Sequence, residues 1–134
     1  MSLSKLFGKQ DAIKTSPDNI AVSGFDPVAY FTQGKPMKGT SQFQFHWHGA
    51  TWQFSTAAHR ELFIRDPKKF SPQFGGYCVL GISMGKFFDG DPEVWNIVDE
   101  KLYLLGNSEI ARRWNEDIHG NIEKATHQWP TLIA

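Results

Sequence analysis

The chain has 134 residues and a mass of 15.2 kDa, which suits one domain with a core of its own. Lys plus Arg equal Asp plus Glu at fourteen each, so no net charge draws the protein to nucleic acid or to an anionic membrane. The lone cysteine excludes an internal disulfide and an all-cysteine metal site within one chain.

The first nineteen residues differ in character from the rest. They are polar and end in Ser16-Pro17-Asp18-Asn19, which predicts a flexible N-terminal arm over residues 1–19 and one domain over residues 20–134. No apolar run approaches the roughly 18 residues of a membrane span, and the first ten residues lack the apolar core of a secretory leader. We therefore expect a soluble, cytoplasmic protein as written, or a periplasmic or exported one if a leader was removed.

The first elements of the domain are predicted to be a short helix and a β-hairpin. Asp26 before Pro27 is a favourable helix start, so a helix is expected from Pro27 to about Phe31. From Phe43 to Phe54 apolar residues alternate with polar ones, which indicates a hairpin. We expect Gly49-Ala50 to be its two-residue loop, with Trp47 opposite Trp52 and every ring on one face.

A second helix is predicted after this hairpin. Ser55 or Thr56 is a candidate cap for a helix that runs to about Asp66, and one further turn is expected at Pro67–Phe70. The inward face of the main helix is expected to consist of Ala58, His59, Leu62 and Phe63. The segment from Tyr77 to Ile82 is short and apolar and fits either a strand or a buried helix.

The last third is predicted to contain a second hairpin and two helices. In the hairpin, Trp95 and Ile97 face Leu104 and Leu102, with Asp99-Glu100 as a turn that requires positive φ at both positions. A helix begins at Asn107 or Ser108, Gly120 separates it from a second helix, and Pro130 ends that one. The expected fold class is α+β, with a small antiparallel sheet from two hairpins packed with several short helices.

The segment Gly75-Gly76-Tyr77-Cys78 is the first candidate for a functional site. It holds the only cysteine, and its two glycines allow the backbone to come close to whatever lies opposite.

Several blocks of the sequence resemble a known family. Residues 51–70, a hairpin strand followed by Phe54-Ser55, His59-Arg60 and Asp66-Pro67, are similar to the core block of the YHS domain family. The blocks Gly24-Phe25-Asp26-Pro27, Gly75-Gly76-Tyr77-Cys78 and Gly90-Asp91-Pro92 resemble its larger stand-alone bacterial branch, over about residues 20–130. The resemblance implies a metal-binding module, with copper or another soft metal. Ser55 and His59 stand where the two family cysteines would be.

A soft-metal site is therefore one hypothesis for function. Cys78, His59 and Met84 offer thiolate, imidazole and thioether, the ligands that copper or zinc prefer, and Tyr77 and Tyr30 are candidate contacts to the ligand. The non-functional alternative is that Cys78 and Met84 fill the core and that His59 is a hydrogen-bonded core histidine. His46 and His48 share a strand face and form a weaker candidate pair.

Two other functions remain open. One is a metal-free domain that binds a small apolar ligand or a protein partner through an aromatic pocket. The other is a thiol-dependent enzyme that uses Cys78, with His119 or His127 as base. The segment Gly81-Ile82-Ser83-Met84-Gly85 matches the G-x-S-x-G pattern, but hairpin strands do not provide the parallel sheet on which that motif works. A non-enzymatic binding module is the expected class, with its oligomeric state open.

Overall fold

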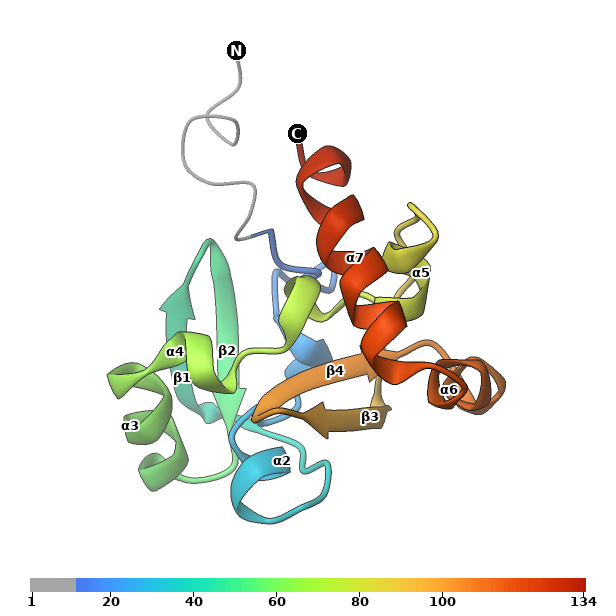
Figure 1. Ribbon diagram of the computed structural model, residues 1–134. Coiled ribbons are helices and arrows are strands. Elements are labelled where there is room, and N and C mark those ends of the chain that lie inside the picture. Colours follow the sequence, from blue (N-terminus) through green and yellow to red (C-terminus); the bar gives the residue numbers. More distant parts are fainter. Residues whose placement is uncertain (1–11) are drawn as a thin grey trace.

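The computed structural model describes residues 12–134 and confirms the α+β class. Two antiparallel two-stranded sheets, each a hairpin of its own, are packed with short helices and a longer C-terminal helix (Figure 1). In chain order the elements are η2 (Val22–Gly24), α2 (Ala29–Thr32), β1 (Thr40–Trp47), β2 (Ala50–Phe54), α3 (Ala57–Arg65), α4 (Pro67–Phe70), η3 (Gln73–Gly76), α5 (Val79–Ser83), β3 (Asp91–Val98), β4 (Lys101–Leu105), α6 (Ser108–Asn115) and α7 (Ile118–Leu132).

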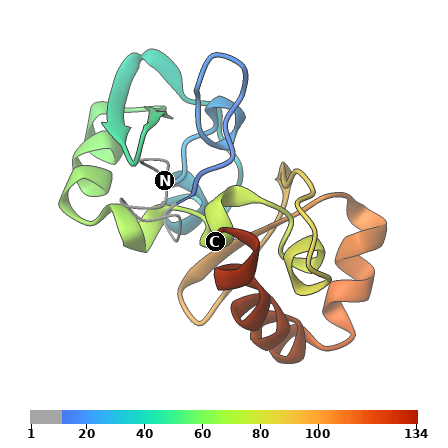
Figure 2. The ribbon, with the colours of Figure 1, turned by 90° about the horizontal axis from the view of Figure 1, so that it is seen from above.

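Strand β4 lies between two hydrophobic clusters. Successive side chains of a strand point to opposite faces. Leu102 and Leu104 accordingly enter the cluster built around the rings of β2 and α3, whereas Tyr103 and Leu105 enter a second cluster with α5, α6 and α7. Figure 2 shows these two halves side by side, with the chain after α4 crossing from one to the other. One buried strand thus supplies side chains to both clusters.

The first hairpin has a different register from the predicted one. Trp47 pairs with Ala50 and Phe45 with Trp52, so the loop is His48-Gly49 and not Gly49-Ala50. Both loop residues have positive φ, 49° and 73°, as a type I′ turn requires. The prediction was wrong because it did not allow histidine to adopt the left-handed conformation. The rings still share one face, because the shift is an even number of residues.

The second hairpin has the predicted register. Ile97 pairs with Leu102 and Trp95 with Leu104, and the turn residues Asp99 and Glu100 have φ of 52° and 64°. Two non-glycine residues in the left-handed region indicate local strain at this turn.

Side-chain caps fix three of the helix starts. Thr56 accepts a hydrogen bond from the amide of His59, Asn107 from that of Ile110, and Asp117 from that of Gly120. The predicted break at Gly120 is therefore wrong: α7 begins at Ile118, and a Cβ at position 120 would overlap the capping carboxylate of Asp117, which would have to move.

Two further expectations about the helices are corrected. Pro130 lies inside the last turn of α7 and does not end it. On α3, His59 and Phe63 are buried, whereas Ala58 and Leu62 are exposed, so the inward face is narrower than predicted.

Residues 12–19 belong to the folded unit, although they fall within the predicted flexible arm. The amide of Lys14 donates to the carbonyl of Gly75 over 2.8 Å, and Thr15 pairs with Ala21. Residues 1–11 of that arm lie outside the described part of the chain.

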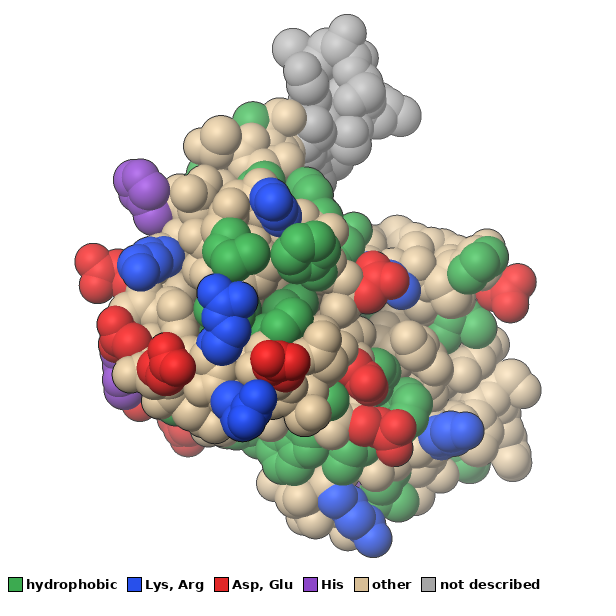
Figure 3. Space-filling view, turned by 90° about the vertical axis from the view of Figure 1, so that its right-hand side faces the viewer, with side chains coloured by type: hydrophobic (Ala, Val, Ile, Leu, Met, Phe, Trp, Pro, Cys, Tyr) green, Lys and Arg blue, Asp and Glu red, His purple; other side chains and the backbone are tan. Residues whose placement is uncertain are grey.

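Within residues 12–134 no helix could span a membrane, and the face drawn in Figure 3 has no patch of a single charge sign. None of the helices within residues 12–134 combines the length and apolar character needed to cross a bilayer. Figure 3 shows acidic and basic side chains interspersed on one face, with hydrophobic side chains between them. That face therefore offers no concentrated field of either sign.

Candidate functional site

The segment Gly75-Gly76-Tyr77-Cys78 lies where the N-terminal segment crosses the connection between the two halves. Phe74, Gly75 and Gly76 have positive φ, and a Cβ on Gly75 would overlap the carbonyl oxygen of Ala12. The glycines thus allow a close backbone approach, as the sequence indicated, and the partner is residues 12–14.

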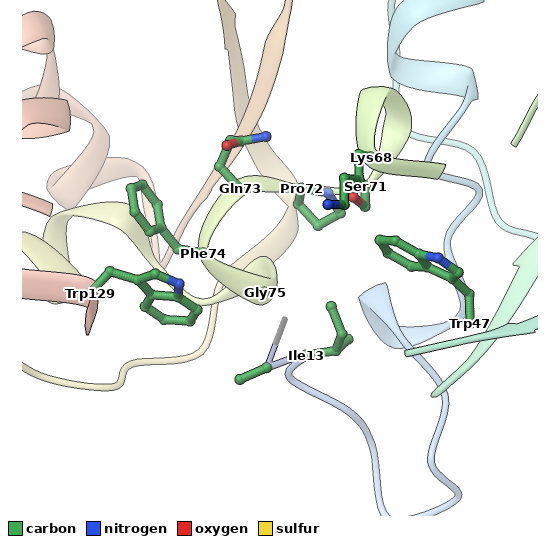
Figure 4. Close-up of a pocket in the computed structure, with 10 residues that line it drawn as sticks. Ile13, Trp47, Lys68, Ser71, Pro72, Gln73, Phe74, Gly75 and Trp129 are labelled. Carbon is green, nitrogen blue, oxygen red and sulfur yellow. The ribbon is translucent and has the colours of Figure 1, made fainter. Parts of the chain in front are cut away.

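Beside this crossing lies a cavity of about 250 Å³ between the two halves of the molecule. Trp47 of β1 lies on one side of the cavity, and Phe74 of η3 and Trp129 of α7 lie on the opposite side (Figure 4). Ile13 lies at its lower side. The remaining lining comes from Ala12, Lys68, Ser71, Pro72, Gln73 and Gly75. A volume slightly below the roughly 300–1,000 Å³ of pockets for drug-sized ligands suits a molecule of one or two rings.

Ring contacts hold the aromatic walls of this cavity in place. Trp47 packs edge-on against Phe63 with ring centroids 5.7 Å apart, and Phe74 packs edge-on against Trp129 at 5.5 Å. Both walls are therefore anchored in the packing of their own half. Between them Lys68 supplies a cation, and Ser71 and Gln73 supply polar groups, so the cavity combines apolar surface with groups that orient a ligand.

A second polar cluster forms around the buried carboxylate of Asp26. Its Oδ1 accepts the amide of Val28, and its Oδ2 accepts the amide and hydroxyl of Ser55 at 2.9 and 2.6 Å. His59 Nδ1 lies 2.6 Å from the same Oδ2, and His59 Nε2 lies 3.1 Å from Thr32 Oγ1. Asp26 is fully buried, and the contacts made by Ser55 and His59 tie the segment around α2 to the start of α3.

This cluster contains the two positions at which the resemblance places cysteines. Ser55 Oγ and His59 Nδ1 lie 3.4 Å apart, but both are directed at Asp26. The ring nitrogen and the hydroxyl thus act as hydrogen-bond donors to a carboxylate.

Cys78 lies in the other half of the molecule. It is fully buried among Val79, Ile82 and Leu105, directly before α5, whereas His59 lies on α3. The two helices lie on opposite sides of the molecule in Figures 1 and 2. The structure therefore does not bring Cys78 and His59 together. Within residues 12–134, no three His, Cys, Asp or Glu side chains form a group that could hold a metal ion.

The other predicted site residues are also dispersed. Met84 ends α5 with 46% of its surface exposed. Tyr77 stacks edge-on with Phe87, and burial, with Asp89 nearby, raises the pKa of its hydroxyl. Tyr30 is buried and donates to the carbonyl of Pro92 over 2.6 Å; burial, followed by the nearby carboxylates, raises its pKa strongly. Neither tyrosine lines the cavity beside Gly75.

His46 and His48, the weaker candidate pair, do not share a strand face, because His48 lies in the turn of the first hairpin. His46 is exposed on β1 and lies 2.9 Å from Thr51 Oγ1, while His48 occupies the turn itself.

Sequence reasoning missed Trp47, Lys68 and Trp129 as neighbours in one site. Each was assigned to its own helix or strand, and no local pattern indicates that three distant segments converge. A signal was present in Pro72-Gln73-Phe74-Gly75-Gly76, whose glycines require a close backbone approach beside a ring.

Comparison of the chain with protein-family models, with curated proteins and with solved structures finds no match in any of the three.

Proposed function

We propose that this protein is a metal-free binding module for a small molecule with a flat apolar body and an anionic group. The observation that carries the proposal is the ring-lined cavity between Trp47 on one side and Phe74 and Trp129 on the other. Flat rings offer large contact area at low entropic cost, and Lys68 at the rim complements a carboxylate.

We rank this function above the soft-metal site. Binding of copper or zinc needs three or four converging ligands, whereas Cys78 is enclosed in one half of the molecule and His59 is engaged by Asp26 in the other. We also rank it above a thiol enzyme, because a fully buried cysteine in apolar surroundings is neither reachable nor activated. The resemblance to the YHS domain family stays a prediction.

The experiment is a binding titration by calorimetry with benzoate, 1-naphthoate and indole-3-carboxylate, and with their neutral amides. We expect the bicyclic acids to bind more tightly than benzoate, because they contact both aromatic walls. The acids should also bind more tightly than the amides, because only the acids pair with Lys68.

Lys68→Gln and Lys69→Gln form a matched pair, since the two lysines are adjacent on α4 and only Lys68 lines this cavity. Lys68→Gln should weaken binding of the acids by about 1.5- to 5-fold, the range for one exposed ion pair, and should leave the amides unaffected. Lys69→Gln should change neither. Equal effects of the two substitutions, or no binding by any of the compounds, would refute the proposal.

A further inference from the structure

A second cavity, separate from the one beside Gly75, opens at the side chain of Thr32. It has a volume of about 580 Å³ and lies between α2, α3, α4 and the turn of the second hairpin. Its lining residues are Phe31, Thr32, Leu62, Lys69, Phe70, Ile97, Asp99 and Glu100. Apolar side chains form most of its walls, and an exposed hydroxyl, a cation and two carboxylates supply its polar groups.

Thr32 is connected to a buried acid–base pair. Its Oγ1 lies 3.1 Å from His59 Nε2, and His59 Nδ1 lies 2.6 Å from Asp26 Oδ2. The order of groups is hydroxyl, imidazole, carboxylate, at distances within the hydrogen-bond reach of nucleophile and base. Thr32 is exposed and lines the cavity, while His59 and Asp26 are 8% and 0% exposed.

The hydrogen bonds at Asp26 determine the tautomer of His59. Because Oδ2 accepts the Ser55 amide, we assign Nδ1 of His59 as a donor to this carboxylate. In the neutral ring Nε2 is then an acceptor. It lies 3.1 Å from Thr32 Oγ1, closer than the Val28 carbonyl oxygen at 3.3 Å, and we assign the single hydroxyl proton of Thr32 to the histidine. That is the arrangement in which a histidine takes the proton of a hydroxyl nucleophile.

We propose that Thr32, His59 and Asp26 form an acyl-transfer site for small esters of apolar carboxylic acids. Thr32 and His59 are the catalytic residues, and Asp26 is a positioning residue that orients the ring. The apolar walls accommodate the acyl chain, Lys69 offers a cation for the developing oxyanion, and Asp99 and Glu100 disfavour anionic esters. The strained turn that carries these two carboxylates is of the kind found at functional sites.

The reaction balances with water as the only added reactant. Thr32 Oγ1 adds to the ester carbonyl carbon while its proton passes to His59 Nε2. The bond from that carbon to the alcohol oxygen breaks, His59 returns the proton to the leaving alcohol, and an acyl ester remains on Thr32. Water then adds to the same carbon with His59 as base, which releases the carboxylic acid and restores the Thr32 hydroxyl.

The alternative is that the same contacts only fasten α2 to α3. Thr126 provides a control for this, because it is an exposed helical threonine whose hydroxyl also faces the carbonyl four residues earlier, 2.8 Å from Ile122 O. Thr32 Oγ1 makes the equivalent contact with Val28 O at 3.3 Å. The two threonines differ in that Thr32 also meets a histidine.

The test measures hydrolysis of p-nitrophenyl butyrate by the full-length chain, and covalent labelling by diethyl p-nitrophenyl phosphate with the labelled residue located by peptide mass spectrometry. We expect label on Thr32. Thr32→Val and His59→Gln should each lower the rate by about 10²- to 10⁴-fold, the contribution of general-base catalysis, while Thr126→Val stays within twofold.

The positioning role of Asp26 needs a readout that a purely structural residue would not change. Asp26→Asn should lower kcat for p-nitrophenyl butyrate with little change in KM, because the ester-binding walls stay in place while the ring of His59 loses its orientation, and it should abolish labelling of Thr32. Circular dichroism checks that each variant is folded. If the Asp26→Asn variant unfolds, comparison of the rates of Thr32→Val and Thr126→Val still tests the proposal, because both threonines are exposed and neither substitution removes a buried group. Equal rates in those two variants, or label on lysines only, would overturn the proposal.

Discussion

Replacement of Gly75 by alanine should disrupt the crossing on which the aromatic cavity depends. Gly75 has φ of +65°, and a Cβ there would overlap the backbone of Ala12. Gly34 has nearly the same φ, +69°, with no atom within 4 Å of the position that an added methyl group would take, so Gly34→Ala isolates the conformational penalty.

The magnitudes follow from these two environments. The left-handed conformation costs alanine about 1–2 kcal/mol, offset by about 0.4–1 kcal/mol of lost unfolded-state entropy, so Gly34→Ala should destabilise by about 1 kcal/mol. Gly75→Ala must in addition displace residues 12–14 and lose the Lys14 amide bond to Gly75, worth about 1 kcal/mol. Loss of packing around Ile13 adds to this, and we expect about 2–3 kcal/mol in total.

Urea unfolding followed by circular dichroism measures both free energies. Gly75→Ala should also weaken binding of 1-naphthoate, because Ala12 and Ile13 line the cavity, whereas Gly34→Ala should leave that affinity unchanged. If the two substitutions lower the free energy of unfolding equally and leave the same affinity for 1-naphthoate, the close backbone approach at Gly75 does not contribute to stability or to binding.

Further predictions concern the two clusters and the helices. Cys78 should resist iodoacetamide in the native protein and react after unfolding, as monitored by mass spectrometry, because it is fully buried. Asp26→Ala should destabilise by about 3–5 kcal/mol in urea unfolding, because it leaves an imidazole, two amides and the Ser55 hydroxyl without their acceptor. Above pH 10, the ordinary tyrosine pKa, unfolded Tyr30 releases a proton that the folded state retains, so this residue should lower stability by up to about 1.4 kcal/mol per pH unit, checked by the difference in urea midpoints between the unmodified protein and Tyr30→Phe at pH 9 to 11. Gly120→Ala should destabilise the native protein but stabilise the Asp117→Ala variant in thermal unfolding, because the atoms nearest to the added methyl group all belong to the capping carboxylate of Asp117.

Local chemistry explains which elements were predictable from the sequence. The caps at Thr56 and Asn107 and the register around Asp99-Glu100 depend on residues a few positions apart, and these predictions are confirmed. The register at His48-Gly49 was mispredicted because two turn types suit similar sequences, and the prediction did not allow His48 to adopt the left-handed conformation that a type I′ turn requires.

The sites depend on contacts between distant segments, which is why they were predicted only in part. His59 was identified as an inward, hydrogen-bonded residue, but its partner Asp26 is 33 positions earlier and was assigned only a capping role. The aromatic alternative was expected as a class, whereas the convergence of β1, α4 and α7 at Gly75 follows from the packing of the two halves.

The most direct test of the proposed binding cavity uses the five tryptophans of the chain. Their indole N–H signals are recorded by ¹H–¹⁵N NMR while indole-3-carboxylate is added. Trp47 and Trp129 line the cavity, whereas Trp95 and Trp114 do not and serve as internal controls. Trp52 is not used as a control, because its indole N–H donates to the carbonyl of Trp47 over 3.0 Å. We predict that the signals of Trp47 and Trp129 shift with a common saturation curve while those of Trp95 and Trp114 stay in place. No shift of either signal, or equal shifts of all five, would contradict the cavity as the binding site.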